Sequence, residues 1–304
     1  MAVSPPMAFV EHAQRLREEV NHVLAAELKF SDRCPSTLSE AMAYAGLGPG
    51  KRLRPILVLL SAEACGGSRD AAMPAAVAVE MVHAYSLVHD DLPAMDDDDL
   101  RRGRSTCHHA FDESTAILAG DALLTRAFEL LATKVRPAEV AANCSATLAK
   151  AAGAEGMVGG QMQDLLATAS QSEGNESTRE RQLEAIHRNK TGALFVASLQ
   201  LGGIVASATD AQRAALVAYG EKIGLAFQIV DDLLDVAGNE GQMGKRVGKD
   251  DALGKLTFPG LLGVSESKAR ASALIHEGCT HLEIFGARGT SLRELAMYLG
   301  ERDS

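Results

Sequence analysis

Six carboxylates fall within ten consecutive residues of this 304-residue chain, and such crowding of like charge is electrostatically costly without cations. They follow an apolar run and comprise Asp90, Asp91, Asp96, Asp97, Asp98 and Asp99. Taken alone, the segment is equally consistent with a solvated acidic loop, because water screens exposed like charges well. A second acidic cluster changes the balance between these two interpretations.

The second cluster has helical spacing. Gln228, Asp231, Asp232 and Asp235 stand at positions i, i+3, i+4 and i+7, so at about 100° per residue they share one stripe of a helix. An acidic stripe on a helix ordinarily faces water. Here the other positions of residues 225–236 are almost all apolar, so we expect the acids to line a cavity.

Both clusters offer oxygen ligands without His or Cys, which favours hard cations, with Mg²⁺ before Zn²⁺ and Mn²⁺ as the alternative to Mg²⁺. Mg²⁺ usually takes further ligands from phosphate groups. Short basic motifs lie at the edges of apolar runs, at residues 50–55, 100–103, 190–192, 244–246 and 254–255. Each alone is typical of a helix-end charge, but together with two acid clusters they predict diphosphate recognition.

We expect helices to position these groups. Hydrophobic residues make up 46% of the chain and aromatic ones only 4%, a mixture that favours helices over a β-sandwich. Thr37 and Glu40 match a capping box, and no segment alternates convincingly at period two. Apolar runs predict helices over residues 51–65, 74–88, 111–132, 140–158, 181–208, 210–236, 267–285 and 292–299. No linker separates them, so we expect one all-α domain over residues 1–304.

The formal charge of −10 argues against a broad nucleic-acid or anionic-membrane surface. Residues 191–209 carry no charge and are long enough to suggest a membrane span, but Gln200, Gly202 and Gly203 suit a helix buried in protein better. Five scattered cysteines without a C-x-x-C spacing indicate reduced thiols, and residues 1–19 lack the apolar stretch of a secretory signal. We therefore expect a cytoplasmic protein without a membrane span.

In this order, the motifs resemble those of the short-chain trans-prenyl diphosphate synthases of the bacterial type, in the polyprenyl synthetase family. The resemblance covers residues 50–55, 83–103, 159–165, 190–194, 227–235 and 244–259. It implies an all-α bundle with a central cavity, of the isoprenoid synthase type, and usually a homodimer. It also implies Mg²⁺-assisted ionisation of an allylic diphosphate, attack by isopentenyl diphosphate on the cation and loss of a proton.

The resemblance assigns roles to residues of both clusters and of the basic motifs. The metal set comprises Asp90, Asp96 and Asp231 as ligands, with Asp91, Asp232 and Asp235 close by. The set for the allylic diphosphate comprises Arg101, Lys190 and Lys245, and Lys255 also joins the substrate-binding residues. The set for isopentenyl diphosphate comprises Lys51, Arg54, His83 and Arg102. Thr191 and Gln228 would direct oxygen atoms at the cation, so that Lys190, Thr191, Gln228 and Arg101 form the catalytic group.

Helix geometry tests one of these assignments. On an ideal helix, Asp96 would point about 120° away from Asp90, so the two could not face one metal ion. Pro93 disfavours a continued regular helix. We therefore expect a bend or loop that brings Asp96 back towards Asp90.

The length of the product should depend on the depth of the cavity that holds its hydrocarbon tail, below Asp90 and Asp91. We call this space the tail cavity. The resemblance selects Tyr85 as the block, because an aromatic residue at this place accompanies farnesyl products in the family. Ideal helix geometry instead puts Ser86 or Leu87 beneath Asp90. The expected product is the fifteen-carbon farnesyl diphosphate, with geranylgeranyl diphosphate as the alternative.

Three other classes remain open. A class I terpene cyclase shares an Asp-rich motif, but its usual second motif combines Asn, Ser and Glu, whereas this chain has Asp231, Asp232 and Asp235. A non-catalytic regulatory subunit would be expected to lack one acid cluster. A Ca²⁺-binding protein would need an EF-hand spacing with its central Gly. For the homodimer, we expect the uncharged residues 199–205 to offer a packing face.

Overall fold

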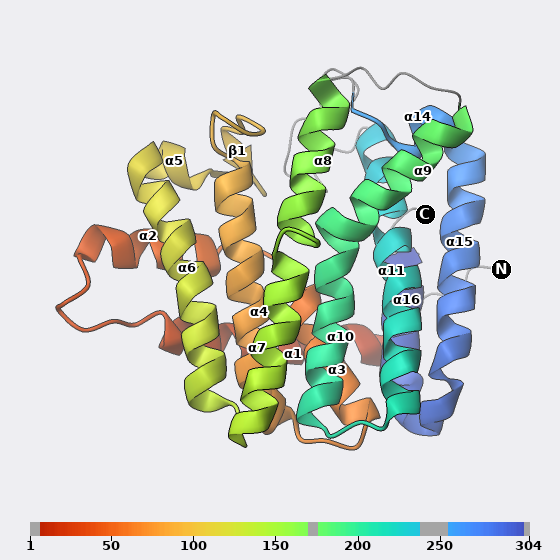
Figure 1. Ribbon diagram of the computed structural model, residues 1–304, viewed down its shortest axis with the longest axis horizontal. Coiled ribbons are helices and arrows are strands. Elements are labelled where there is room, and N and C mark those ends of the chain that lie inside the picture. The colour runs from red at the N-terminus through yellow and green to blue at the C-terminus, as the bar shows by residue number, and fades with distance from the viewer. Residues whose placement is uncertain (1–6, 170–175, 238–254, 301–304) are drawn as a thin grey trace.

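Helices α6, α4, α10, α11 and α15 stand side by side in this order across the molecule (Figure 1). The computed structural model describes residues 7–169, 176–237 and 255–300. The first half contains α1 (Met7–Glu27), α2 (Ser36–Gly46), α3 (Leu53–Ala64), α4 (Arg69–Asp90), α5 (Cys107–Ala110), α6 (Glu113–Lys134) and α7 (Ala138–Ala152). The second half contains α8 (Met157–Ala169), α9 (Glu176–His187), α10 (Ala193–Val205), α11 (Asp210–Ala237), α14 (Phe258–Leu262), α15 (Val264–Thr280) and α16 (Thr290–Gly300).

Helices α3 and α10 form the centre of the bundle because they are apolar on nearly every side, as fully buried helices are. They touch closely at Gly202, where a Cβ atom would lie 2.2 Å from the carbonyl oxygen of Val58. Leu199 and Leu201 of α10 are fully buried. The prediction of a packing face at residues 199–205 is therefore wrong, since this segment belongs to the core of the chain itself.

One helix among the described residues, α4, is long and apolar enough to cross a membrane by length and composition alone. However, 67% of its apolar window is buried inside the protein. This burial is typical of a core helix. The uncharged stretch considered from the sequence, residues 191–209, is occupied mainly by α10, whose apolar side chains pack inside the bundle.

Three local departures from regular helix structure were not predicted. Residues 140–158 are interrupted after Ala152, because Gly153 leaves the helical conformation before α8 begins. Residues 181–208 contain a π-helical turn, η1 (Arg188–Gly192), between α9 and α10. A two-stranded hairpin, β1 (Leu100–Arg101) with β2 (Arg104–Ser105), follows the first acidic cluster.

Two helix ends complete the comparison with the sequence. The prediction of a capping box at Thr37 and Glu40 is wrong. Helix α2 begins at Ser36, Pro35 occupies the N-cap position, and no side chain caps the helix. Towards the C-terminus, a 3₁₀ segment, η2 (His281–Gly289), kinks at Gly286 and leads into α16. Helix α16 packs back on α11 and α3, which closes the core.

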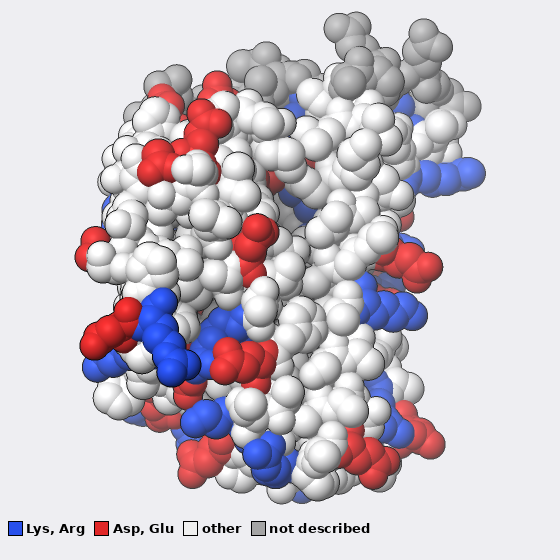
Figure 2. All heavy atoms as spheres, turned by 60° about the vertical axis from the view of Figure 1, so that its left-hand side comes forward, with Lys and Arg blue, Asp and Glu red and all other residues white. Residues whose placement is uncertain are grey.

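Exposed apolar side chains gather on two helices. Ile117 and Leu118 on α6 are 44% and 58% exposed, and α8 carries Val158, Met162 and Leu166 at i, i+4 and i+8 with 50–57% exposure. The side of the molecule that bears α2, α5 and α6 also has a broad area without charged residues (Figure 2). We refer to these five residues as the α6/α8 apolar set.

Candidate active site

A cavity of about 610 Å³ opens among the helices and brings both acidic clusters together. One side carries Asp90, Asp96 and Asp98, which follow from the end of α4. The other side carries Gln228, Asp231, Asp232 and Asp235 of α11, which confirms that the acidic stripe faces a cavity. Basic residues of the predicted substrate sets line the same space, namely Lys51, Arg54, Arg101, Arg102, Lys190 and Lys255.

The first acidic side is built by a loop that folds back on the end of α4. The amide of Asp96 donates to the carbonyl oxygen of Asp90 at 2.9 Å, and the amide of Asp98 donates to that of Asp91 at 3.2 Å. The chain therefore reverses directly around Pro93. This confirms the predicted bend, because Asp90 and Asp96 both line the cavity despite their unfavourable helical spacing.

The carboxyl group of Asp90 is held in a partly desolvated position. Burial raises its pKa, and Asp96 adds to the rise, while Lys190 and Arg101 act in the opposite direction. The amide of Gln161 on α8 hydrogen-bonds to this carboxylate. A carboxylate that is costly to ionise beside another acid is a natural position for a bound cation.

Two lysines reach the cavity and are held there by carboxylates. Lys190 Nζ lies 2.7 Å from Asp164 Oδ2, and Lys255 Nζ lies 3.1 Å from Asp96 Oδ1. Burial would lower the pKa of Lys190, but Asp90 and Asp164 outweigh it and raise that pKa. The ammonium group is therefore fully charged at neutral pH and available to an anionic ligand.

Helix α8 supplies two residues that the sequence did not identify as functional, Gln161 and Asp164. It approaches the π-helical turn so closely that a Cβ atom on Gly160 would lie 2.2 Å from the backbone nitrogen of Lys190. This contact leaves no room for a side chain at position 160. The i, i+3 spacing of Gln161 and Asp164 was the available signal, because it places both side chains on one face of α8.

The π-helical turn aligns a row of polar groups across to α11. Thr191 Oγ1 donates to Gln228 Oε1 at 3.0 Å, and Gln228 Nε2 donates to Asp232 Oδ1 at 3.0 Å. Asp232 is buried, and its Oδ2 atom accepts the amide of Phe258 at 3.1 Å. Asp232 thus fixes which end of the Gln228 amide faces Thr191. Single π-helical turns inside α-helices are frequent at functional sites.

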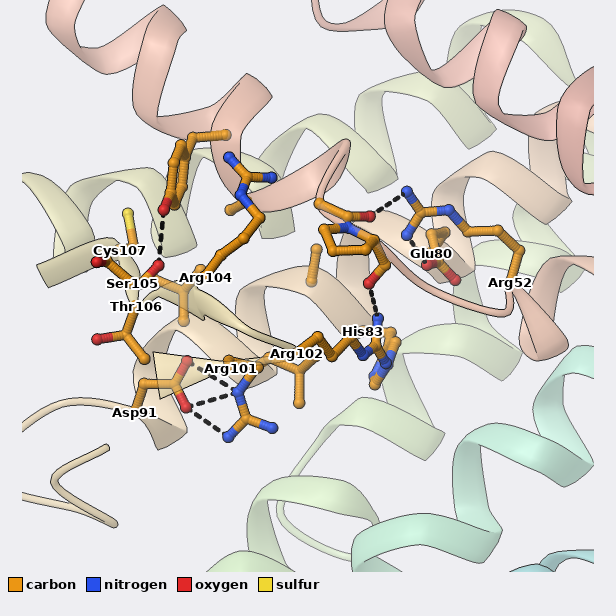
Figure 3. Close-up of a pocket in the computed structure, with 17 residues that line it drawn as sticks. Arg52, Glu80, His83, Asp91, Arg101, Arg102, Arg104, Ser105, Thr106 and Cys107 are labelled. Atoms are coloured by element: carbon orange, nitrogen blue, oxygen red, sulfur yellow. Dashed lines mark hydrogen bonds and ion pairs between the residues drawn. The ribbon is translucent and has the colours of Figure 1, made fainter. Parts of the chain in front are cut away.

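The hairpin presents Arg101 and Arg102 on successive residues. Arg102 and Gly103 both have positive φ, 52° and 75°, as a two-residue type I′ turn requires. Arg101 Nε binds both oxygens of Asp91 at 2.6 and 2.9 Å, whereas Arg102 Nη1 donates to the carbonyl oxygen of Pro49 at 2.6 Å (Figure 3). Asp91 does not line the large cavity, because its carboxylate anchors Arg101 on the side of a smaller neighbouring pocket.

Helix α2 holds the hairpin in place from the other side of that small pocket. Tyr44 donates its hydroxyl to the carbonyl oxygen of Ser105 at 2.7 Å, and the guanidinium of Arg104 lies 4.1 Å from the Tyr44 ring centre (Figure 3). Both contacts restrain the strand that follows the turn. The two arginines of the turn are therefore fixed to the scaffold through α2 and α4 together.

A second basic group lies where α3 and α4 meet. Burial lowers the pKa of Arg54 to about 10, and the pKa of His83 falls well below its usual value because of burial and four neighbouring arginines. The imidazole is therefore neutral at pH 7. A neutral ring among guanidinium groups can donate a hydrogen bond to an anion without competing for its charge.

Arg52, which lies between the predicted residues Lys51 and Arg54, is structural. It is 6% exposed, and its guanidinium binds Glu80 Oε1, Asn21 Oδ1 and the carbonyl oxygen of Gly48, each at 2.8 Å. Its backbone is left-handed, with a φ of 53°. Lys51 and Arg54, which the resemblance assigns to ligand binding, line the cavity on either side of it.

A family model described as polyprenyl synthetase matches residues 35–282. The chain belongs to the polyprenyl synthetase family. It is 44% identical to a farnesyl diphosphate synthase of Haemophilus influenzae, with 97% of this chain and 99% of that protein covered. It is also 44% identical to a chloroplastic geranylgeranyl pyrophosphate synthase of Capsicum annuum, over 89% of this chain and 73% of that protein. The crystal structure of an FPP/GFPP synthase from Zymomonas mobilis superposes with a TM-score of 0.86 at 38% identity, covering 97% and 99% of the two chains.

The donor set of this polyprenyl synthetase family member fits Mg²⁺, which prefers oxygen ligands. Asp90, Asp96 and Asp231 all present carboxylates to the cavity. Among the residues that the structure describes, no three acidic, His or Cys side chains form a metal site by themselves. Mg²⁺ usually takes part of its ligand set from phosphate groups.

The residues expected to limit product length lie on one turn of α4. Tyr85 is 6% exposed and packs edge-on against His89 with ring centres 5.7 Å apart, while Ser86 donates its hydroxyl to the carbonyl oxygen of His83. Leu87, one of the two residues that ideal helix geometry placed beneath Asp90, lines both the large cavity and the small pocket. Tyr85 and Ser86 line neither of these two spaces.

One predicted substrate residue, Lys245, lies outside the described residues. Every other residue of the predicted metal and substrate sets is described, and all of them except Asp91 line the large cavity. Gln161 is the contact of the first acidic cluster that sequence analysis missed, and Asp164 is the carboxylate partner of Lys190 to which it assigned no role.

We predict that Arg52→Met will destabilise the fold by about 3 kcal/mol, because it leaves the carboxylate of Glu80 buried without its cation. The free energy of unfolding in urea measures this. Lys51→Met, which removes an exposed charge next to it, should change the same quantity by less than about 0.5 kcal/mol. Equal effects of the two substitutions would contradict the structural role of Arg52.

Proposed function

We propose that the protein is a single-domain trans-prenyltransferase that condenses isopentenyl diphosphate with dimethylallyl or geranyl diphosphate and yields farnesyl diphosphate. One observation carries this proposal. Two carboxylate clusters from separate elements face one cavity, and lysine and arginine side chains interleave with them there. This arrangement suits two diphosphates better than one, because the basic residues around the acids form two groups. One comprises Arg101 and Lys190, and the other comprises Lys51, Arg54 and Arg102.

The demanding step is departure of diphosphate from the allylic carbon. Lys190 and Arg101 would hold the leaving group, and both are fixed by carboxylates, Asp164 and Asp91. Mg²⁺ held by Asp90, Asp96 and Asp231 would neutralise the developing charge as the carbon–oxygen bond breaks. Lys255, and Lys245 from outside the described residues, would contribute further positive charge. Pre-positioned charges of this kind stabilise the transition state without reorganising.

The allylic cation needs oxygen atoms that stabilise it without trapping it. Thr191 and Gln228 provide a hydroxyl and an amide oxygen at the cavity wall, 3.0 Å from each other. Because the Gln228 amide donates to Asp232, its orientation is fixed with the oxygen towards Thr191. Hydroxyl and amide oxygens are weak nucleophiles, so the cation would persist long enough to meet the second substrate.

Isopentenyl diphosphate would bind where α3, α4 and the hairpin meet. Lys51, Arg54 and Arg102 would pair with its phosphate oxygens, and guanidinium groups suit such oxygens because their N–H bonds are arranged in a fork. The neutral imidazole of His83 would donate one hydrogen bond to the same group. The double bond would then attack the cation, and loss of a proton would complete the new allylic product.

The decisive assay supplies radiolabelled isopentenyl diphosphate with dimethylallyl or geranyl diphosphate and Mg²⁺, followed by dephosphorylation and product sizing. We predict incorporation by the wild-type protein, its loss after chelation with EDTA, and a fall in kcat of about a thousandfold in Asp231→Asn, equivalent to roughly 4 kcal/mol of lost stabilisation.

The matched control is Asp210→Asn, which removes an exposed carboxylate at the start of the same helix and should leave kcat unchanged. Hydrocarbon formation without incorporation would point to a terpene cyclase. Complete absence of turnover would point to a binding or regulatory role.

For product length we propose that Tyr85 closes the tail cavity and limits the product to fifteen carbons. We predict that Tyr85→Ala will give longer products, since each further methylene buried contributes about 0.8 kcal/mol once the ring is removed. Chromatography of the dephosphorylated products measures this. Leu87→Ala is the comparison, and lengthening in Leu87→Ala but not in Tyr85→Ala would move the block to the cavity-lining residue.

A geranylgeranyl product is the second candidate. The specific observation in its favour is that Tyr85 and Ser86 line neither of the two spaces described above, so neither side chain stands directly in the cavity. The product distribution of the wild-type protein with geranyl diphosphate as starter separates a fifteen-carbon from a twenty-carbon end point.

We further propose that the protein acts as a homodimer that packs through the α6/α8 apolar set. We predict a species of twice the 32.0 kDa chain mass in sedimentation velocity experiments. Met162→Lys, at the centre of the exposed stripe on α8, should shift this species to the monomer because it would bury a charge. Met297→Lys, a similarly exposed position on α16, should leave the mass unchanged.

We also place the enzyme in the cytoplasm. All five cysteines are free thiols in the structure, which suits a reducing compartment.

A further inference from the structure

Protein groups hold both carboxylate oxygens of Asp232. Oδ1 accepts from Gln228, and Oδ2 accepts the backbone amide of Phe258 at 3.1 Å. The Nε2 atom of His187 lies 3.6 Å from the same Oδ2. The orientation of Gln228 and Thr191 therefore depends on where α14, which begins at Phe258, stands relative to α11.

Phe258 is fully buried and lies between two other side chains. Its ring stacks on the His187 ring at 5.6 Å with an interplanar angle of 26°, and the guanidinium carbon of Arg270 lies 5.6 Å from its centre. The ring and the amide of one residue thus connect α15 to the acidic stripe. Movement of this ring would carry the amide away from Asp232.

Arg270 is anchored on α15 by two carboxylates of α9. Its Nη1 atom donates to Glu180 Oε1 at 2.5 Å, and its Nη2 atom binds Glu184. The side chain is 32% exposed and does not line the large cavity. It therefore joins α9, α14 and α15 from outside the cavity, and Phe258 connects it to the site.

We propose that Arg270 is a positioning residue for the reaction, acting through Phe258 and Asp232 on Gln228 and Thr191. The inference rests on the proposed function, because it assigns the affected groups to cation stabilisation. The inference predicts different effects of Arg270 on the two substrates. The groups for isopentenyl diphosphate lie on α3, α4 and the hairpin, so its binding should not depend on Arg270.

The test variant is Arg270→Met, which keeps the packing of the side-chain stem and removes the guanidinium. We expect kcat with geranyl diphosphate to fall about tenfold, while KM for isopentenyl diphosphate stays within about twofold. Hydrogen exchange resolved by mass spectrometry should show faster exchange at the Phe258 amide. Arg270→Lys, which retains the charge, should restore most of kcat.

The matched control is Lys222→Met, because Lys222 and Glu277 form another ion pair that ties α15 to a neighbouring helix, with 2.6 Å between charged atoms. It should change neither kcat nor exchange at Phe258. If Arg270→Met does not fold, the double variant Glu180→Gln, Glu184→Gln removes the anchors of Arg270 and should lower kcat and protection of Phe258 in the same direction.

Three results would overturn the proposal. The first two are unchanged kcat in a folded Arg270→Met protein and a fall in kcat without faster exchange at Phe258. A rise in KM for isopentenyl diphosphate equal to the loss of kcat would also overturn it, since a general loss of structure would explain both. If the wild-type protein makes no elongated product, the proposed function fails instead. Hydrogen exchange at the Phe258 amide, compared between wild-type and Arg270→Met protein, still tests the link from Arg270 to Phe258, because this measurement needs no turnover.

Discussion

The whole site depends on one electrostatic constraint, which is that acidic side chains gathered inside an apolar bundle must be matched by cations. Desolvation penalises ionised carboxylates, and close like charges add to the penalty. The protein meets it locally, with Lys190 against Asp164, Lys255 against Asp96 and Arg101 against Asp91. Each of these cations is also suited to a diphosphate. Bound substrate and metal could therefore replace internal pairs with new ones while the balance of charge in the cavity is kept.

The scaffold is regular where it packs and irregular where it presents chemistry. Helices α3 and α10 are buried nearly all round and give a rigid centre. In contrast, Asp96 lies on a loop that folds back, Thr191 lies on a π-helical turn, and Arg102 lies in a turn with positive φ. Each irregularity aims a side chain in a direction that a regular helix could not provide. Close packing around them keeps these directions fixed.

Much of this arrangement was predictable, and the limits have physical causes. The helical spacing of Gln228, Asp231 and Asp235 predicted that they share one face of a helix. Pro93 predicted the bend that brings Asp96 back towards Asp90. Both predictions were possible because they depend only on residues close together in the sequence. The sequence contained no comparable signal for the π-helical turn at Lys190, since a single extra residue per turn leaves composition unchanged. Pairings between distant elements, such as that of Asp164 with Lys190, depend on how helices pack and could not be assigned from spacing.

The hairpin turn limits how the two proposed diphosphate sites can vary. Arg101 and Arg102 are neighbours in sequence, so their Cα atoms are about 3.8 Å apart, whatever the rest of the fold does. Since Arg102 and Gly103 occupy a two-residue turn, one inserted residue would shift the register and turn the arginines to opposite sides. The distance between the proposed sites for the allylic and the isopentenyl diphosphate is therefore set, at the hairpin, by a single peptide unit. Substitutions that change the depth of the cavity should be tolerated far more readily than insertions that change this distance.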